Sequence, residues 1–77
     1  MSERDRILFG RVSSFDKARG IGALRYDAGS EGAVAEVPFH CTAISDGSRD
    51  IAVGREVAFV LRRRHGRLEA DAVTPLG

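Results

Sequence analysis

The sequence predicts an all-β domain in which five short antiparallel strands form a small closed barrel. Three observations lead to this fold class. No apolar spacing of a helical period occurs anywhere in the chain, and short runs rich in β-branched and aromatic residues recur between clusters of Gly and Asp. A chain of 77 residues also leaves no room for a separate layer of helices. Closing the sheet would remove the exposed strand edges that otherwise favour aggregation.

The predicted strands follow one another through tight connections, with one longer link between the third and the fourth. In chain order, the strands are residues 7–15, 21–26, 33–40, 56–63 and 67–73. The connections are residues 16–20, 27–32, 42–50 and 64–66. Within the longer link, a short helical turn is expected before the loop at Asp46-Gly47-Ser48.

Alternation of side chains along the strands separates two faces of the predicted sheet. Within each of three runs, one side is separated from the other: Gly22, Leu24 and Tyr26 oppose Ile21, Ala23 and Arg25; Ala35, Val37 and Phe39 oppose Glu36, Pro38 and His40; and Val57, Phe59 and Leu61 oppose Glu56, Ala58, Val60 and Arg62. The first run does not alternate cleanly from Ser13 to Phe15, which predicts a β-bulge and leaves the faces of Ser14 and Phe15 open. Pro38 has no N–H for a strand ladder, so its nitrogen is expected to face a gap or an edge.

Composition and charge restrict the class of protein. We expect a flexible segment at residues 1–6 and a single domain at residues 7–77, located in the cytoplasm because the N-terminus has no apolar run of signal-peptide type. No apolar stretch is long enough to cross a membrane. A single cysteine, Cys41, excludes an internal disulfide, and the spacing of His40, Cys41 and His65 is not that of a metal site. We therefore expect no cofactor and no metal.

The net charge of +1 does not by itself indicate a polyanionic partner, but the distribution of charge is uneven. The densest positive cluster surrounds the predicted hairpin tip and contains Arg62, Arg63, Arg64 and Arg67. Neighbouring residues of a strand point to opposite faces, so these arginines form one patch only if the tip is twisted. We interpret them as a solvated hairpin.

Five segments, in the right order and spacing, resemble the bacterial cold-shock domains. Residues 10–16 are similar to that family's first strand, residues 17–24 and 37–44 to its two ribonucleoprotein motifs, residues 51–59 to its Leu-x-x-Gly-x-x-Val-x-Phe segment and residues 69–73 to its closing strand. The resemblance implies a five-stranded antiparallel OB-fold barrel that binds single-stranded RNA or DNA.

The sequence differs from this family mainly at the positions where the family has aromatic residues that stack on bases. Position by position, the family's aromatic residues are replaced by Ser14, Ile21, Ala23, Pro38 and Cys41. Of the family's binding face, the resemblance implies that Phe15 and His40 remain, with Arg19 in place of a lysine. Lys17 and Arg25 are further cations that, with Arg19, are candidates to line a groove along the nucleic-acid backbone, since Arg25 shares a strand face with Ile21 and Ala23. Base–aromatic stacking contributes roughly 1–3 kcal/mol per base. The sequence therefore predicts weak, salt-sensitive binding of single-stranded RNA or DNA with little base preference.

Each of these residues also has a purely structural interpretation. Phe15 fits a partly buried residue at the barrel rim, His40 fits a cross-strand contact, and the three cations fit a solvated surface. A second function, from another class, is a protein-interaction surface or homodimer contact centred on Ile21, Ala23, Pro38 and Cys41. An enzyme is not expected, because no nucleophile with a positioned base, paired acids or metal set is visible.

Overall fold

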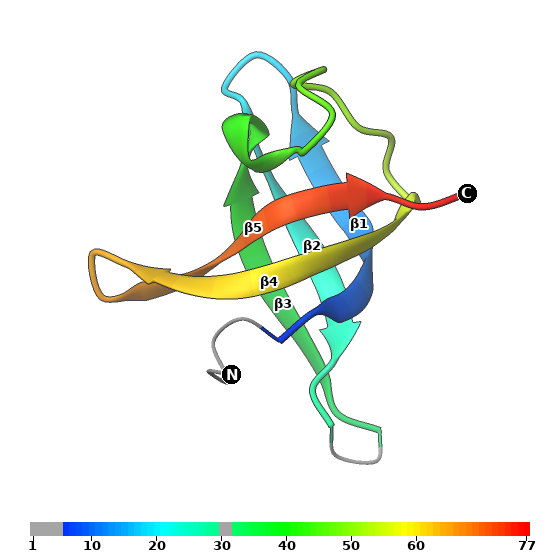
Figure 1. Cartoon of the computed structure of the whole chain (residues 1–77), viewed down its shortest axis with the longest axis vertical. Helices are drawn as coiled ribbons and strands as arrows, with labels where there is room; N and C mark the ends of the chain where they lie inside the picture. Colours follow the sequence, from blue (N-terminus) through cyan, green and yellow to red (C-terminus); the bar gives the residue numbers. More distant parts are fainter. Residues whose placement is uncertain (1–5, 30–31) are drawn as a thin grey trace.

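The computed structural model describes residues 6–29 and 32–77 and contains five β-strands and one short 3-10 helix (Figure 1). Their bounds are β1 Leu8–Asp16, β2 Ile21–Asp27, β3 Val34–His40, η2 Cys41–Ala43, β4 Glu56–Arg64 and β5 Arg67–Pro75. Each predicted strand agrees with these bounds to within two residues. Residues 1–5 of the predicted flexible segment and residues 30 and 31 of the predicted turn lie outside the described part of the chain. No described helix is long and apolar enough to cross a membrane.

All strand pairs are antiparallel, and the strands are ordered β3-β2-β1-β4-β5. The sheet curls so that β4 and β5 cross in front of the other three strands (Figure 1). The edge strands β3 and β5 approach one another, but the bridge beside them is an isolated one between Ile44 and Val73. The barrel is thus less completely closed than expected. Pro38 lies on the edge strand β3, a position that suits a residue without an N–H for a strand ladder.

The core lies inside this curled sheet and is made almost entirely of aliphatic and aromatic side chains. Its buried residues are Val12, Leu24, Val37, Phe39, Ile44, Ile51, Val57, Phe59, Ala70 and Val73. They come from all five strands and from the link after η2, so burial of this single cluster holds the strands together. The predicted alternation is confirmed, because inward residues are buried or half-buried along β2, β3 and β4.

The predicted irregularity in the first strand is a bulge at Ser13. Val12 pairs with Leu24, and the next pair along β1 is Ser14 with Ala23. The extra residue reverses the alternation, so Ser14 is exposed whereas the half-buried Phe15 turns toward the core. The ring of Phe15 stacks on Phe39 with their centroids 5.9 Å apart. The bulge therefore directs this aromatic residue inward, as its structural interpretation predicts.

A second irregularity, between β4 and β5, places Ala72 in the left-handed region at a φ of 50°. Non-glycine residues rarely adopt this conformation, and Asn adopts it more readily than Ala. We expect the exposed substitution Ala72→Asn to stabilise the fold by about 1 kcal/mol, raising Tm by about 4–8 °C. Thermal unfolding followed by circular dichroism measures this. The control Ala52→Asn, at an exposed position without positive φ, should leave Tm nearly unchanged; equal shifts would contradict the strain at Ala72.

Candidate functional site

The outward face of β1, β2 and β3 brings together many of the residues singled out in the sequence. Register places His40 beside Ile21, Pro38 beside Ala23, and Ala23 beside Ser14 on its other side. Arg25 continues the same side of β2 and faces Glu36. We call this surface the outer face; its members are Ser14, Ile21, Ala23, Arg25, Glu36, Pro38 and His40. Side chains from three strands can therefore contact one extended ligand.

The centre of the outer face is apolar but has no aromatic ring. Ile21 is 45% exposed, Pro38 is exposed, and Ala23 is half-buried. Cys41 does not extend this surface, because it is half-buried and packs against the core. Its Sγ lies only 2.8 Å from where a Cβ on Gly20 would stand. The centre therefore offers a ligand smooth aliphatic surface from β2 and β3.

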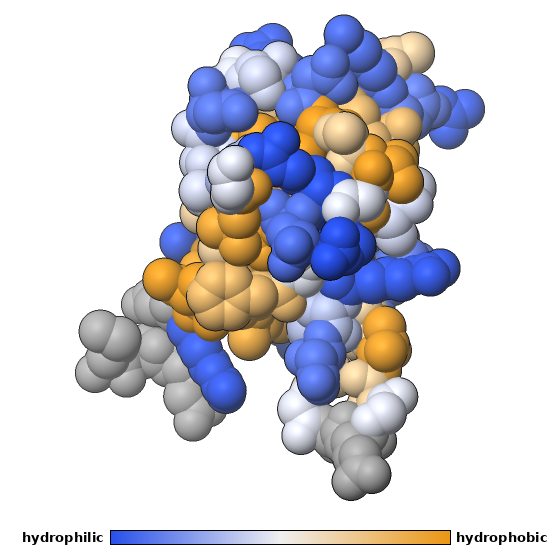
Figure 2. All heavy atoms as spheres, turned by 90° about the vertical axis from the view of Figure 1, so that its right-hand side faces the viewer, coloured by the Kyte–Doolittle hydropathy of each residue, from blue (hydrophilic) through white to orange (hydrophobic). Residues whose placement is uncertain are grey.

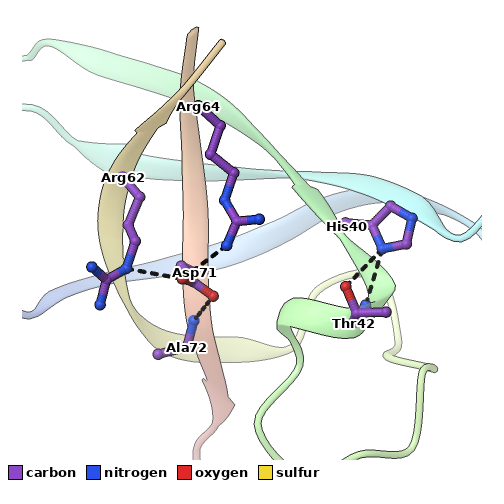
Figure 3. A network of polar contacts seen from close by, with 6 residues as sticks. All are labelled: His40, Thr42, Arg62, Arg64, Asp71 and Ala72. Atoms are coloured by element: carbon purple, nitrogen blue, oxygen red, sulfur yellow. Dashed lines mark hydrogen bonds and ion pairs between the residues drawn. The ribbon is translucent and has the colours of Figure 1, made fainter. Parts of the chain in front are cut away.

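His40 is held by the first turn of η2. Its Nδ1 accepts a hydrogen bond from the backbone N–H of Thr42 at 3.2 Å and contacts Thr42 Oγ1 at 2.9 Å (Figure 3). A ring nitrogen that accepts a backbone N–H carries no proton, so neutral His40 has its proton on Nε2. The side chain is exposed, so Nε2–H can donate to a base or a phosphate that lies against the outer face.

Each of the three predicted cations lies beside a carboxylate. The ion pairs are Lys17 Nζ with Asp50 Oδ2 at 3.2 Å, Arg19 Nε with Asp16 Oδ2 at 3.7 Å, and Arg25 Nε with Glu36 Oε2 at 3.2 Å. All six side chains are at least half exposed, so these pairs contribute little to stability. They nevertheless cancel local positive charge, and a phosphate must compete with these carboxylates for the cations.

Glu36, the carboxylate of the outer face, is held by two side-chain hydrogen bonds. Its Oε2 accepts a hydrogen bond from Ser13 Oγ at 2.8 Å, and this bond, followed by that from Arg25, lowers the pKa of Glu36. A lowered pKa in the folded state means that these contacts stabilise the fold above the unfolded-state pKa. That stabilisation is lost as pH falls through the folded-state pKa. At neutral pH, Glu36 is ionised and retains Arg25.

The sequence interpretation did not single out Phe9, or Glu36 on the outer face. Phe9 is 65% exposed and lines a hollow of about 350 Å³ together with Val34, Arg11, Arg25 and Glu56. The sequence did carry a signal for Phe9: strand alternation before the bulge places it on the same side of β1 as Arg11. Figure 2 shows apolar and hydrophilic side chains interspersed over the side that it draws. The ion pairs of Arg25 with Glu36 and of Arg11 with Glu56 make the charge around this hollow mixed rather than uniformly positive.

A comparison with solved structures supports a cold-shock-domain-like fold for this chain. No family model matches the sequence, and no curated protein matches it. Among solved structures, the chain is similar to the Drosophila Unr CSD456 structure, which contains cold-shock domains, with a TM-score of 0.74 and 29% sequence identity. The match covers 94% of this chain and 27% of that one, so this chain corresponds to a minor part of the longer protein. The fold expected from the five sequence segments is thereby confirmed.

Proposed function

We propose that this chain, which has a cold-shock-domain-like fold, binds single-stranded RNA or DNA over its outer face without catalysing a reaction. The observation that carries the proposal is the register that aligns Ile21, Arg25 and His40 on one exposed surface. The similarity to a structure containing cold-shock domains supports the same class of ligand. Extended single strands suit this surface, because their bases and phosphates are both accessible to side chains.

The composition of the outer face leads us to propose weak binding with little base preference. Ile21 and Pro38 provide apolar contact to any base but lack the π-face that strengthens stacking. Lys17, Arg19 and Arg25 provide attraction to phosphates, which is independent of sequence and falls with salt. Their carboxylate partners reduce this attraction, so the affinity depends on how readily the ion pairs open.

Fluorescence anisotropy with labelled oligo-U and oligo-dT tests the proposal. We expect saturable binding at low salt that weakens steeply as salt is raised, and weaker binding to a blunt duplex of equal length. Failure to bind either single strand at low salt and high protein concentration would reject the proposal. Size-exclusion chromatography without oligonucleotide tests the alternative, in which Ile21 and Pro38 contact a second copy or a protein partner. A dimer whose outer face stays inaccessible to oligonucleotide would favour that alternative.

Removing the negative charge of Glu36 should strengthen nucleic-acid binding. In Glu36→Gln, Arg25 loses its ionic partner and becomes available to a phosphate. We expect several-fold tighter binding at low salt, and a plot of log affinity against log salt that is steeper by about 0.7, as for one added phosphate contact on a single strand. Asp46→Asn makes the same change in net charge in the loop after η2 and should have a smaller effect. Equal effects of the two variants would show that only net charge matters.

A further inference from the structure

We propose that the outward side of the β4–β5 hairpin is a second phosphate-binding surface, which holds the backbone of the strand bound on the outer face. We call its residues Arg62, Arg64 and Arg67 the hairpin arginines. This inference rests on the proposed function and extends it to residues outside the outer face. Three independent features of the hairpin support it: a shared carboxylate, an opposed pair of like charges, and a position next to His40.

The shared carboxylate belongs to Asp71. Its Oδ2 contacts Arg62 Nε at 2.9 Å and Arg64 Nη2 at 3.4 Å, while its Oδ1 accepts the N–H of Ala72 at 2.8 Å (Figure 3). Only 25% of the Asp71 side chain is exposed, against 47% for Arg62 and 57% for Arg64. One fixed negative charge therefore orients two guanidinium groups, whose remaining N–H groups are available to an anion.

The opposed like charges are Arg64 on β4 and Arg67 on β5, which lie directly opposite one another in the antiparallel pair. Like charges opposite one another in an antiparallel pair are destabilising. Among the residues that the structure describes, no carboxylate oxygen lies within 4 Å of the Arg67 guanidinium. A phosphate placed between the two guanidiniums would relieve their repulsion, so the hairpin is better suited to an anion-bound state than to the free one.

The hairpin arginines share one side of the two strands. Alternation places Arg62 and Arg64 on the same side of β4, with Arg67, Glu69 and Asp71 on the matching side of β5. Arg63 points the other way, and its Nη1 donates to the carbonyl of Gly66 at 3.4 Å. The arginine run thus forms a patch of three residues opposed by two acids, and the net charge of this side is positive.

The hairpin patch adjoins the end of the outer face. A small hollow of about 60 Å³ lies between β3 and the hairpin, lined by His40, Thr42, Arg64, Glu69 and Asp71 among others. A single strand that leaves the outer face at His40 would therefore meet Arg64 next. Guanidinium groups bind phosphate oxygens in pairs of parallel hydrogen bonds, which makes the phosphodiester backbone the fitting ligand.

The test compares Arg64→Gln/Arg67→Gln with the control Arg55→Gln/Arg63→Gln, which removes the same two charges from exposed positions outside the hairpin patch, using oligo-U of about 4 and about 12 nucleotides. We expect the double variant to bind the longer strand several-fold more weakly, with a salt dependence shallower by about 1.4 in log–log slope, as for two lost phosphate contacts. Binding of the shorter strand, which fits on the outer face alone, should change much less. Circular dichroism checks that each variant is folded, and the single variant Arg67→Gln replaces the double one if it is not.

The outcomes separate this inference from the proposed function. If the wild type binds both strands but Arg64→Gln/Arg67→Gln binds the longer one as tightly as Arg55→Gln/Arg63→Gln does, the hairpin surface is refuted and the outer face stands. If the wild type binds neither strand, the proposed function fails, and the inference fails with it. Poly-glutamate serves as an anionic competitor that has no phosphates. If it displaces the longer labelled oligonucleotide as effectively as the same unlabelled oligonucleotide does, the hairpin arginines bind anions in general, and their assignment to a nucleic-acid backbone is wrong.

Discussion

Phenylalanine at both Ile21 and Ala23 is expected to raise the affinity for single-stranded oligonucleotides by about 30-fold or more. Both positions lie on the outward side of β2, beside His40 and Pro38 on β3. Neither belongs to the buried core, so the rings would be presented to the ligand rather than forced into the interior. Each ring that stacks on a base contributes roughly 1–3 kcal/mol, and about 1.4 kcal/mol is a factor of ten in affinity.

Leucine at the same two positions is the matched control for this gain. Ile21→Leu/Ala23→Leu supplies apolar area of similar size at the same sites but no π-face. Anisotropy titrations of both double variants with the same oligo-dT then separate stacking from general apolar contact. An equal increase in the two variants would show that stacking is not the missing interaction. No increase with phenylalanine would show that bases do not approach β2 at all.

Gly22→Ala is expected to destabilise the fold by about 3 kcal/mol and to lower Tm by about 12–24 °C. A Cβ at Gly22 would stand 2.6 Å from the carbonyl oxygen of Ser14, 2.7 Å from Phe39 Cζ and 2.9 Å from Phe15 Cδ1. The first neighbour is backbone, and the other two belong to stacked rings that already fill the space. No small side-chain adjustment relieves all three contacts, so β1 and β2 must separate locally.

Gly54→Ala provides the comparison for this loss of stability. Gly54 has a φ of 90°, and a Cβ there would meet no atom within 4 Å. Its substitution therefore reports the cost of backbone conformation without crowding, which is about 1 kcal/mol. Thermal and urea unfolding of the two variants measure the difference. If Gly22→Ala were no less stable than Gly54→Ala, the close approach of Ser14 and Phe39 to Gly22 would be contradicted.

The strands and the core were predictable because their signals are local. Alternation in β2, β3 and β4 identifies Leu24, Val37 and Phe59 as inward residues without reference to any partner strand. The bulge near Ser13 was also visible as a break in this pattern. The side of the sheet to which Phe15 turns could not be predicted from the sequence, because it depends on which residue of β1 is the extra one in the pairing with β2.

Most of the electrostatics of the candidate site could not be predicted, because two of its three ion pairs join distant parts of the chain and only Arg19 and Asp16 are close in sequence. Lys17 meets Asp50 across 33 positions of sequence, and the position of Arg25 beside Glu36 follows from the register between β2 and β3. Sequence alone therefore indicated three free cations where the fold forms three ion pairs. The grouping of Arg62, Arg64 and Arg67 likewise requires the register of the hairpin and the position of Asp71.

The most direct test of the outer face as a single-strand binding surface is a ¹⁵N chemical-shift titration of the full chain with oligo-dT at low salt. We predict that the largest amide shifts fall on Ile21, Ala23, Arg25 and His40, and that they saturate with oligonucleotide and reverse when salt is added. Shifts confined to the loop of residues 45–55, or no shifts at all, would contradict the proposed binding surface.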